Sequence, residues 1–277
     1  MEQRFQAYEI FNSIVRQGKY SNLAVKELLK GGQEEKRLVH AMVMGTLEKL
    51  IYIDYIIKAY ARGRVRPVVQ DILRLAVYQL LFMNVPHYAL CSQWAELAVK
   101  LGKGAQKGYI NGVLRSIIRA MPNLPLPEKE AQPAKYLSVK YSYPEFLVEE
   151  SISERGWEET EKMLSYQPEY YTSVRFEQSK ITREDFIKEL DRLDCQYKPG
   201  LLYNNVFLIK GNKIFQDNLF KSGICSVQSE PSMLVCNVVH PLKGCRVLDC
   251  CAAPGGKSVY MAALMGEGEV TAMDKYG

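Results

Sequence analysis

Apolar residues recur at helical spacing through the first 121 residues of the chain, with few interruptions. A repeating apolar stripe of this kind predicts amphipathic helices, each of which buries one face. Glycines and prolines divide the pattern, so we expect six helices, at residues 4–17, 23–29, 34–60, 67–80, 89–101 and 105–121. Six helices joined by short connections predict an all-α domain over residues 1–121.

The helical pattern is followed by a proline-rich segment. Residues 122–133, PNLPLPEKEAQP, contain four prolines and little apolar surface, which predicts an extended linker. Helical patterns return at 134–141 and 144–154, and from residue 171 the pattern alternates as in strands, with one more helix after Thr182. We therefore expect a helical and small α+β module over residues 134–223.

The last part of the chain, residues 224–277, has a different order of elements. A short apolar strand ends at Asp249, a glycine loop and a helix at 257–264 follow, and a second strand at 270–273 leads into Asp274. Strand, glycine loop, helix, strand and acidic residue form the opening half of a nucleotide-binding βαβ unit, in which the acidic residue accepts hydrogen bonds from ribose. We expect the start of an α/β Rossmann-like domain.

Two phosphate-binding alternatives compete for this loop. Gly256-Lys257-Ser258 matches the second half of a P-loop, but Cys251 occupies the position of the first glycine, where a side chain obstructs the wrap around phosphates. The dinucleotide fingerprint G-x-G-x-x-G is absent. S-adenosylmethionine carries adenosine and ribose without a phosphate, and is the ligand that the pattern favours.

Composition and charge limit the classes of protein to which this chain can belong. The 277 residues carry a net charge of +5, but residues 1–125 hold 18 Lys and Arg against 9 Asp and Glu, so the basic excess is N-terminal. The seven cysteines lack C-x-x-C spacing and only three histidines accompany them, which argues against a metal site and predicts reduced thiols in a cytoplasmic protein. No signal segment and no apolar run long enough for a membrane span are found in the sequence.

The basic residues of the helical domain form two groups. One is a loop, and the other recurs every fourth residue along the last helix, so that its members share one face. A basic loop beside a basic stripe is typical of a surface that binds an RNA backbone, and the alternative is an ordinary solvated helix face. The predicted RNA-binding residues are Arg62, Arg64, Arg66, Lys107, Asn111, Arg115 and Arg119.

The loop also carries a family resemblance. The run DCCAAPGGK at Asp249–Lys257 resembles motif I, D-x-C-A-A-P-G-G-K, of the Sun family of RNA (cytosine-5)-methyltransferases. The resemblance implies an RRM-like fold for the α+β module and S-adenosylmethionine-dependent methylation of carbon 5 of a cytosine in 16S ribosomal RNA. We also expect a monomer. It implies that Asp274 holds the ribose and that the cofactor pocket is lined by Cys251, Ala252, Ala253, Pro254, Gly255, Gly256 and Lys257.

A second resemblance lies in the helical domain. Residues 71–119 resemble the RNA-binding domain of the NusB family, and GYINGVLR at 108–115 matches its G-F-V-N-x-V-L-R box. The chain departs from the Sun family at Cys91-Ser92-Gln93, at Glu177 where an asparagine is usual, and at Ser229 where an aspartate is usual. We therefore assign no RNA contacts to those positions.

The catalytic cysteines of the Sun family lie in later motifs that contain Pro-Cys and Thr-Cys-Ser. The sequence ends at Gly277 before either motif, so we expect a C-terminally truncated chain that is itself inactive. Cys250 and Cys251 are interpreted as small loop residues rather than nucleophiles. The alternative function is that of a non-catalytic RNA-binding protein.

Overall fold

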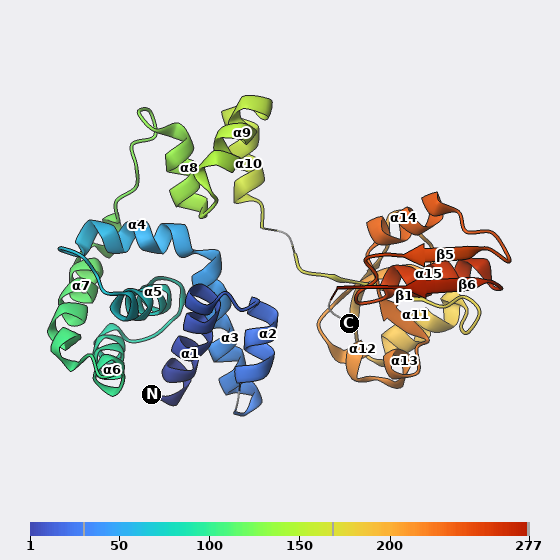
Figure 1. Ribbon diagram of the computed structural model, residues 1–277, viewed down its shortest axis with the longest axis horizontal. Helices are drawn as coiled ribbons and strands as arrows, with labels where there is room; N and C mark the ends of the chain where they lie inside the picture. The colour runs from blue at the N-terminus through green and yellow to red at the C-terminus, as the bar shows by residue number, and fades with distance from the viewer. Residues whose placement is uncertain (30, 168, 276–277) are drawn as a thin grey trace. The chain divides into compact units, whose positions relative to one another are not determined.

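The computed structural model describes residues 1–29, 31–167 and 169–275. The chain divides into two compact units, Met1–Tyr166 and Gln167–Gly277. The first unit is helical and the second combines helices with strands (Figure 1).

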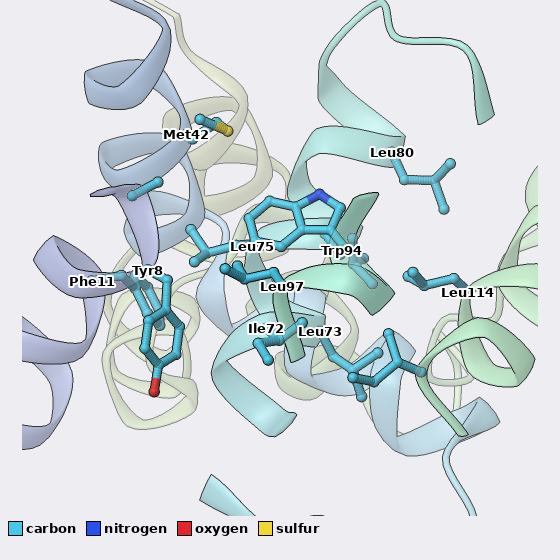
Figure 2. Close-up of a cluster of buried hydrophobic side chains, with 14 of the residues drawn as sticks. Tyr8, Phe11, Met42, Ile72, Leu73, Leu75, Leu80, Trp94, Leu97 and Leu114 are labelled. Atoms are coloured by element: carbon cyan, nitrogen blue, oxygen red, sulfur yellow. The ribbon is translucent and has the colours of Figure 1, made fainter. Parts of the chain in front are cut away.

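The helices of the N-terminal domain surround a central helix. Helix α5 packs against α1, α3, α4, α6 and α7, and it starts at Pro67, which suits the first turn of a helix. Its buried Ile72, Leu73 and Leu75 belong to the same hydrophobic cluster as Trp94 of α6, whose side chain is fully buried (Figure 2). The predicted all-α domain is confirmed, with helices α1 (Glu2–Gln17), α2 (Ser21–Leu28), α3 (Gln33–Glu48), α4 (Leu50–Tyr60), α5 (Pro67–Phe82), α6 (His87–Lys100) and α7 (Lys107–Ala120).

The single long helix expected at 34–60 is wrong, because the structure has two helices that meet at Lys49. This residue has φ −98° and ψ 17°, outside the helical region. The amides of Ile51 and Tyr52, in the first turn of α4, instead donate to the side-chain oxygen of Ser142, over 3.0 and 3.4 Å. A contact 90 residues away in sequence thus satisfies the amides that the break exposes.

Three further helices belong to the first unit. Helices α8 (Pro133–Tyr141), α9 (Glu145–Arg155) and α10 (Trp157–Ser165) pack around Leu137, Val148 and Leu164. Helix α8 also contacts α4, beside the bonds to Ser142. The proline-rich segment 122–133 therefore connects helices within the first unit, and the division into units lies after Tyr166 rather than at this segment.

The second unit contains a four-stranded antiparallel sheet in the order β2-β3-β1-β4. The strands are β1 (Thr172–Phe176), β2 (Gln196–Pro199), β3 (Val206–Lys210) and β4 (Cys225–Val227). Helix α11 (Arg183–Arg192) packs Phe186 against Phe176 of β1 and Phe207 of β3, while the short helices α12 (Lys213–Gln216) and α13 (Asn218–Lys221) lead into β4. Strand β4, expected to belong with the cofactor region, is thus paired with β1.

The remaining strands form a separate parallel pair. Strands β5 (Arg246–Asp249) and β6 (Glu269–Ala272) lie side by side and are joined through helix α15 (Gly256–Met265). Helix α14 (Glu230–Val239) precedes β5 and packs on α15. The expected order of strand, glycine loop, helix and strand is therefore present, and the loop between β5 and α15 lies at the carboxyl end of β5.

Candidate functional site

The glycine loop turns tightly between Asp249 and the start of α15. Gly255 caps α15 with φ 97°, a left-handed conformation that favours glycine, and its amide donates to the Ala252 carbonyl over 2.5 Å. Gly256 has an ordinary φ, and a Cβ added there would meet no described atom within 4 Å. The open backbone at Gly256 leaves room for a ligand to approach closely.

The Asp249 carboxylate accepts hydrogen bonds from the glycine loop and from the first turn of α15. Its Oδ1 accepts the Cys251 amide over 3.2 Å, and its Oδ2 accepts the Ser258 hydroxyl over 2.7 Å. Ser258 is also buried, at 7% exposure. A P-loop uses the equivalent hydroxyl on Mg²⁺, so its engagement with Asp249 adds to the case against that alternative.

Asp274 lies against the same loop, as the sequence pattern predicts. Its Oδ2 accepts the Ala253 amide over 3.0 Å, and on either side Ala252 donates to the Met273 carbonyl and Met273 donates to the Asp249 carbonyl. The side chain is exposed. An exposed carboxylate beside the loop is the acceptor that the sequence pattern predicts for ribose hydroxyls.

The other predicted pocket residues form a mostly exposed surface. Ala252 and Gly255 are half-buried, while Ala253, Pro254, Gly256 and Lys257 are exposed. The Ala253–Pro254 peptide bond is cis. Lys257 is a cation in the first turn of α15, where the helix dipole disfavours it unless an anionic group is near.

The cysteines of the loop differ from the buried thiols elsewhere in the chain. Cys250 and Cys251 are exposed, whereas Cys91, Cys225 and Cys236 are buried. Burial raises the pKa of Cys225 to about 12, with the charge of Asp217 as a smaller cause. None of these observations gives a loop cysteine a catalytic partner, so their interpretation as loop residues stays a prediction.

The structure brings the two groups of basic residues together. Arg62, Arg64 and Arg66 line a pocket of about 290 Å³ with Gln106 and Tyr109, and the Tyr109 hydroxyl donates to the Arg62 carbonyl over 3.2 Å. The loop therefore lies beside the first turn of α7. The basic stripe continues along this helix, with Lys107, Arg115 and Arg119 exposed and Asn111 half-buried.

These basic residues are not neutralised within the part of the chain that is described. No ion pair joins a carboxylate to any of the six cations, although elsewhere the first unit pairs its arginines closely, as in Arg16–Asp71 at 2.8 Å and Arg74–Asp54 at 2.7 Å. The stripe on α7 is opposite its buried side, which consists of Ile110, Val113, Leu114 and Ile117. We call the seven predicted RNA-binding residues the basic surface.

Sequence reasoning missed a buried group beneath the glycine loop. Arg175 of β1 is 2% exposed and forms an ion pair with Glu177, so it is unavailable to RNA. Gln228, also buried, accepts from Arg175 and donates to the Gly256 carbonyl. The only signal in the sequence is an arginine at an inward position of a strand.

Neither a membrane-spanning helix nor a metal-binding cluster is found in residues 1–29, 31–167 and 169–275. No helix in these ranges is long and apolar enough to cross a membrane. No group of three or more His, Cys, Asp or Glu side chains in them is arranged to hold a metal ion.

Comparisons with known proteins identify relatives over nearly the whole chain. The chain is 34% identical over 265 residues to the probable ribosomal RNA small subunit methyltransferase B of Bacillus subtilis (strain 168), covering 92% of this chain and 58% of the relative. It is 28% identical over 279 residues to the ribosomal RNA small subunit methyltransferase B of Escherichia coli O1:K1 / APEC, covering 98% and 63%. It thus spans about three-fifths of the length of these curated relatives.

A solved structure and a family model add to this. The crystal structure of PH0851 matches with a TM-score of 0.72 at 24% identity, covering 99% of this chain and 63% of that one, which shows a shared fold. Residues 1–119 match the model of the NusB family. The chain is therefore similar to the ribosomal RNA small subunit methyltransferases B over nearly its whole length, and its residues 1–119 are similar to the NusB family.

Proposed function

We propose that this chain supplies the RNA-binding domain and the cofactor loop of an S-adenosylmethionine-dependent methyltransferase that acts on carbon 5 of a cytosine in 16S ribosomal RNA. The observation that carries the proposal is the Asp274 carboxylate, which lies against a glycine loop whose Gly256 backbone is open. The names of the curated relatives agree with this substrate class.

The cofactor assignment is supported by the chemistry of the loop. Asp274 is positioned to accept hydrogen bonds from ribose hydroxyls, as the acidic residue of a nucleotide-binding βαβ unit does. The first amides of α15 and the Lys257 ammonium present positive charge, which suits the carboxylate of the methionine part. The cofactor would supply the methyl group, and the residues named here would bind and orient it.

The finer fold assignments follow the same reasoning. The parallel β5–α15–β6 unit corresponds to the start of a Rossmann-like domain, with the ligand at the carboxyl end of its strands. The antiparallel sheet β2-β3-β1-β4 with its helices corresponds to an RRM-like module. We assign no catalytic nucleophile within the described residues.

The basic surface is the second part of the proposal. Three arginines around one pocket and a stripe of cations on α7 offer a run of unneutralised donors for phosphate oxygens. Because this surface belongs to the NusB-family domain, RNA binding without methyl transfer is the alternative function for the chain. We also propose that the protein is cytoplasmic, since ribosomal RNA is found there, and that it is a monomer.

The test is a calorimetric titration of the whole chain with S-adenosylmethionine. We expect saturable binding that Asp274→Ala weakens at least about tenfold, the loss expected for hydrogen bonds to a charged group. Glu269→Ala is the matched control, because Glu269 is an exposed acid on β6 whose carboxylate pairs with Arg246 over 3.1 Å. Equal binding by wild type and Asp274→Ala would contradict the assignment of Asp274.

A further inference from the structure

A buried polar network connects the antiparallel sheet to the glycine loop. The Arg175 guanidinium of β1 forms an ion pair with Glu177 at 2.5 Å, and its Nε donates to the Gln228 side-chain oxygen over 2.9 Å. The same guanidinium lies 4.7 Å from the centre of the Tyr260 ring of α15. One of its neighbours, Tyr260, therefore belongs to α15, the helix that follows the loop.

Gln228 connects Arg175 to the glycine loop. Because a guanidinium only donates, the Gln228 oxygen faces Arg175, and the amide nitrogen is left to donate to the Gly256 carbonyl over 3.1 Å. The Gln228 main chain is fixed as well, since its carbonyl accepts the Ser173 hydroxyl over 2.7 Å and its amide donates to the Ser173 carbonyl. The side chain has no freedom to turn without breaking a buried bond.

This arrangement is more than a contribution to packing. Gly256 is the first residue of α15, and a Cβ built there, as at Gly255, would meet no described atom outside its own helix and chain neighbours within 4 Å. An apolar side chain at 228 would fill the same space without orienting the carbonyl. A buried arginine and a buried amide are costly to desolvate, and the bonds between them and to Gly256 offset that cost only in one orientation of the Gln228 side chain.

We infer that Arg175 and Gln228 are positioning residues that fix the Gly256 carbonyl and, through it, the geometry of the cofactor loop. Arg175 holds the Gln228 amide in one orientation, and Gln228 holds the start of α15. The Glu177 carboxylate neutralises the buried guanidinium of Arg175, so Glu177 has a structural role. For cofactor affinity the inference rests on the proposed function.

The test replaces only the donor to Gly256. Gln228→Glu keeps the size of the side chain and still accepts from Arg175, but it presents an oxygen to the Gly256 carbonyl. The first readout is hydrogen–deuterium exchange of the whole chain without ligand. We expect exchange in the segment 250–260 to become about five- to tenfold faster, as for the loss of one buried hydrogen bond, with β1 and β3 unchanged.

The second readout is the dissociation constant for S-adenosylmethionine, which we expect to rise about tenfold while the melting temperature changes little. Glu230→Gln is the matched control: Glu230 is also buried, but it accepts the amides of Leu201, Leu202 and Tyr203 and not those of the loop. Gln228→Asn, which shortens the side chain and stays neutral, replaces Gln228→Glu if that variant fails to fold.

The outcomes separate the two claims. Unchanged exchange in segment 250–260, or changes of equal size in Gln228→Glu and Glu230→Gln, would overturn the positioning role. Wild-type binding with an unchanged dissociation constant in Gln228→Glu would overturn it for cofactor affinity. A wild-type chain that does not bind S-adenosylmethionine contradicts the proposed function, and exchange then still decides whether Gln228 positions the loop.

Discussion

Asp71 is the most deeply buried charge of the helical domain, and its removal tests how that domain is held together. Its side chain is 0% exposed and joins α5 to α1, because it accepts from the Arg16 Nε and a terminal nitrogen over 2.9 and 2.8 Å. Arg74 donates to it as well, over 3.0 Å. Asp71→Asn keeps the volume of the side chain and removes its charge.

The expected loss of unfolding free energy in Asp71→Asn follows from these bonds. Removing one partner of a buried ion pair costs about 3–5 kcal/mol, because the remaining charge is left unpaired. Arg16 is 36% exposed and recovers water, and Arg74 keeps its two bonds to Asp54, so we expect the lower end, about 3 kcal/mol. Asp54→Asn is the matched control at a 34% exposed carboxylate, for which we expect about 1 kcal/mol.

The assay is urea unfolding followed by tryptophan fluorescence. Both tryptophans, Trp94 and Trp157, lie in the first unit, so the signal reports that unit alone. With a urea dependence of about 2 kcal/mol per molar, Asp71→Asn should lower the midpoint by about 1.5 M and Asp54→Asn by about 0.5 M. Equal shifts for the two variants, or a shift below about 0.5 M for Asp71→Asn, would refute the reasoning.

Three other predictions follow from single contacts. Gly45→Ala should destabilise the first unit by about 1–3 kcal/mol, because a Cβ there overlaps the Tyr78 ring, whereas Gly112→Ala, with no atom within 4 Å, should stabilise α7 by up to about 1 kcal/mol; thermal melts of both variants compare them. Burial alone would raise the pKa of Glu230, but hydrogen bonds from three backbone amides outweigh it and lower the pKa, so the ionised carboxylate stabilises the fold. This stabilisation is complete above about pH 4.3 and is lost as the pH falls further. In acid titrations followed by circular dichroism, Glu230→Gln should remove that part of the pH dependence, and an acid curve identical to that of the wild type would contradict the prediction. Arg64→Ala should weaken binding to a 16S ribosomal RNA fragment and reduce the slope of log affinity against log salt by about 1, while the exposed Arg37→Ala should leave the slope unchanged in filter binding.

The local elements were predictable where one physical signal decides them. The helical period and Pro67 locate α5, and the order of strand, glycine loop and helix locates β5 and α15, because these signals lie within a few residues. The helix expected at 34–60 was wrong because Ser142 satisfies the amides exposed at the break near Lys49. A side chain 90 residues away leaves no mark on the local apolar pattern.

The candidate site, too, was predictable only where the signal is local in the sequence. Asp274 was placed beside the loop by a spacing rule, and the structure has its carboxylate bonded to Ala253. Arg175 and Gln228 were not found, because their role depends on β4 pairing with β1 and bringing residue 228 beneath Gly256. Pairing between distant strands is a property of the fold that a single sequence does not display.

The central claim is that the glycine loop binds S-adenosylmethionine and not a nucleoside triphosphate, and a pair of calorimetric titrations tests it directly. The whole chain is titrated calorimetrically with S-adenosylmethionine and, separately, with ATP and Mg²⁺. The account predicts saturable, one-to-one binding of S-adenosylmethionine and no heat with ATP, since Ser258 is engaged by Asp249 and the loop lacks the first P-loop glycine. Saturable binding of ATP, or no binding of S-adenosylmethionine by a chain that circular dichroism shows to be folded, would contradict it.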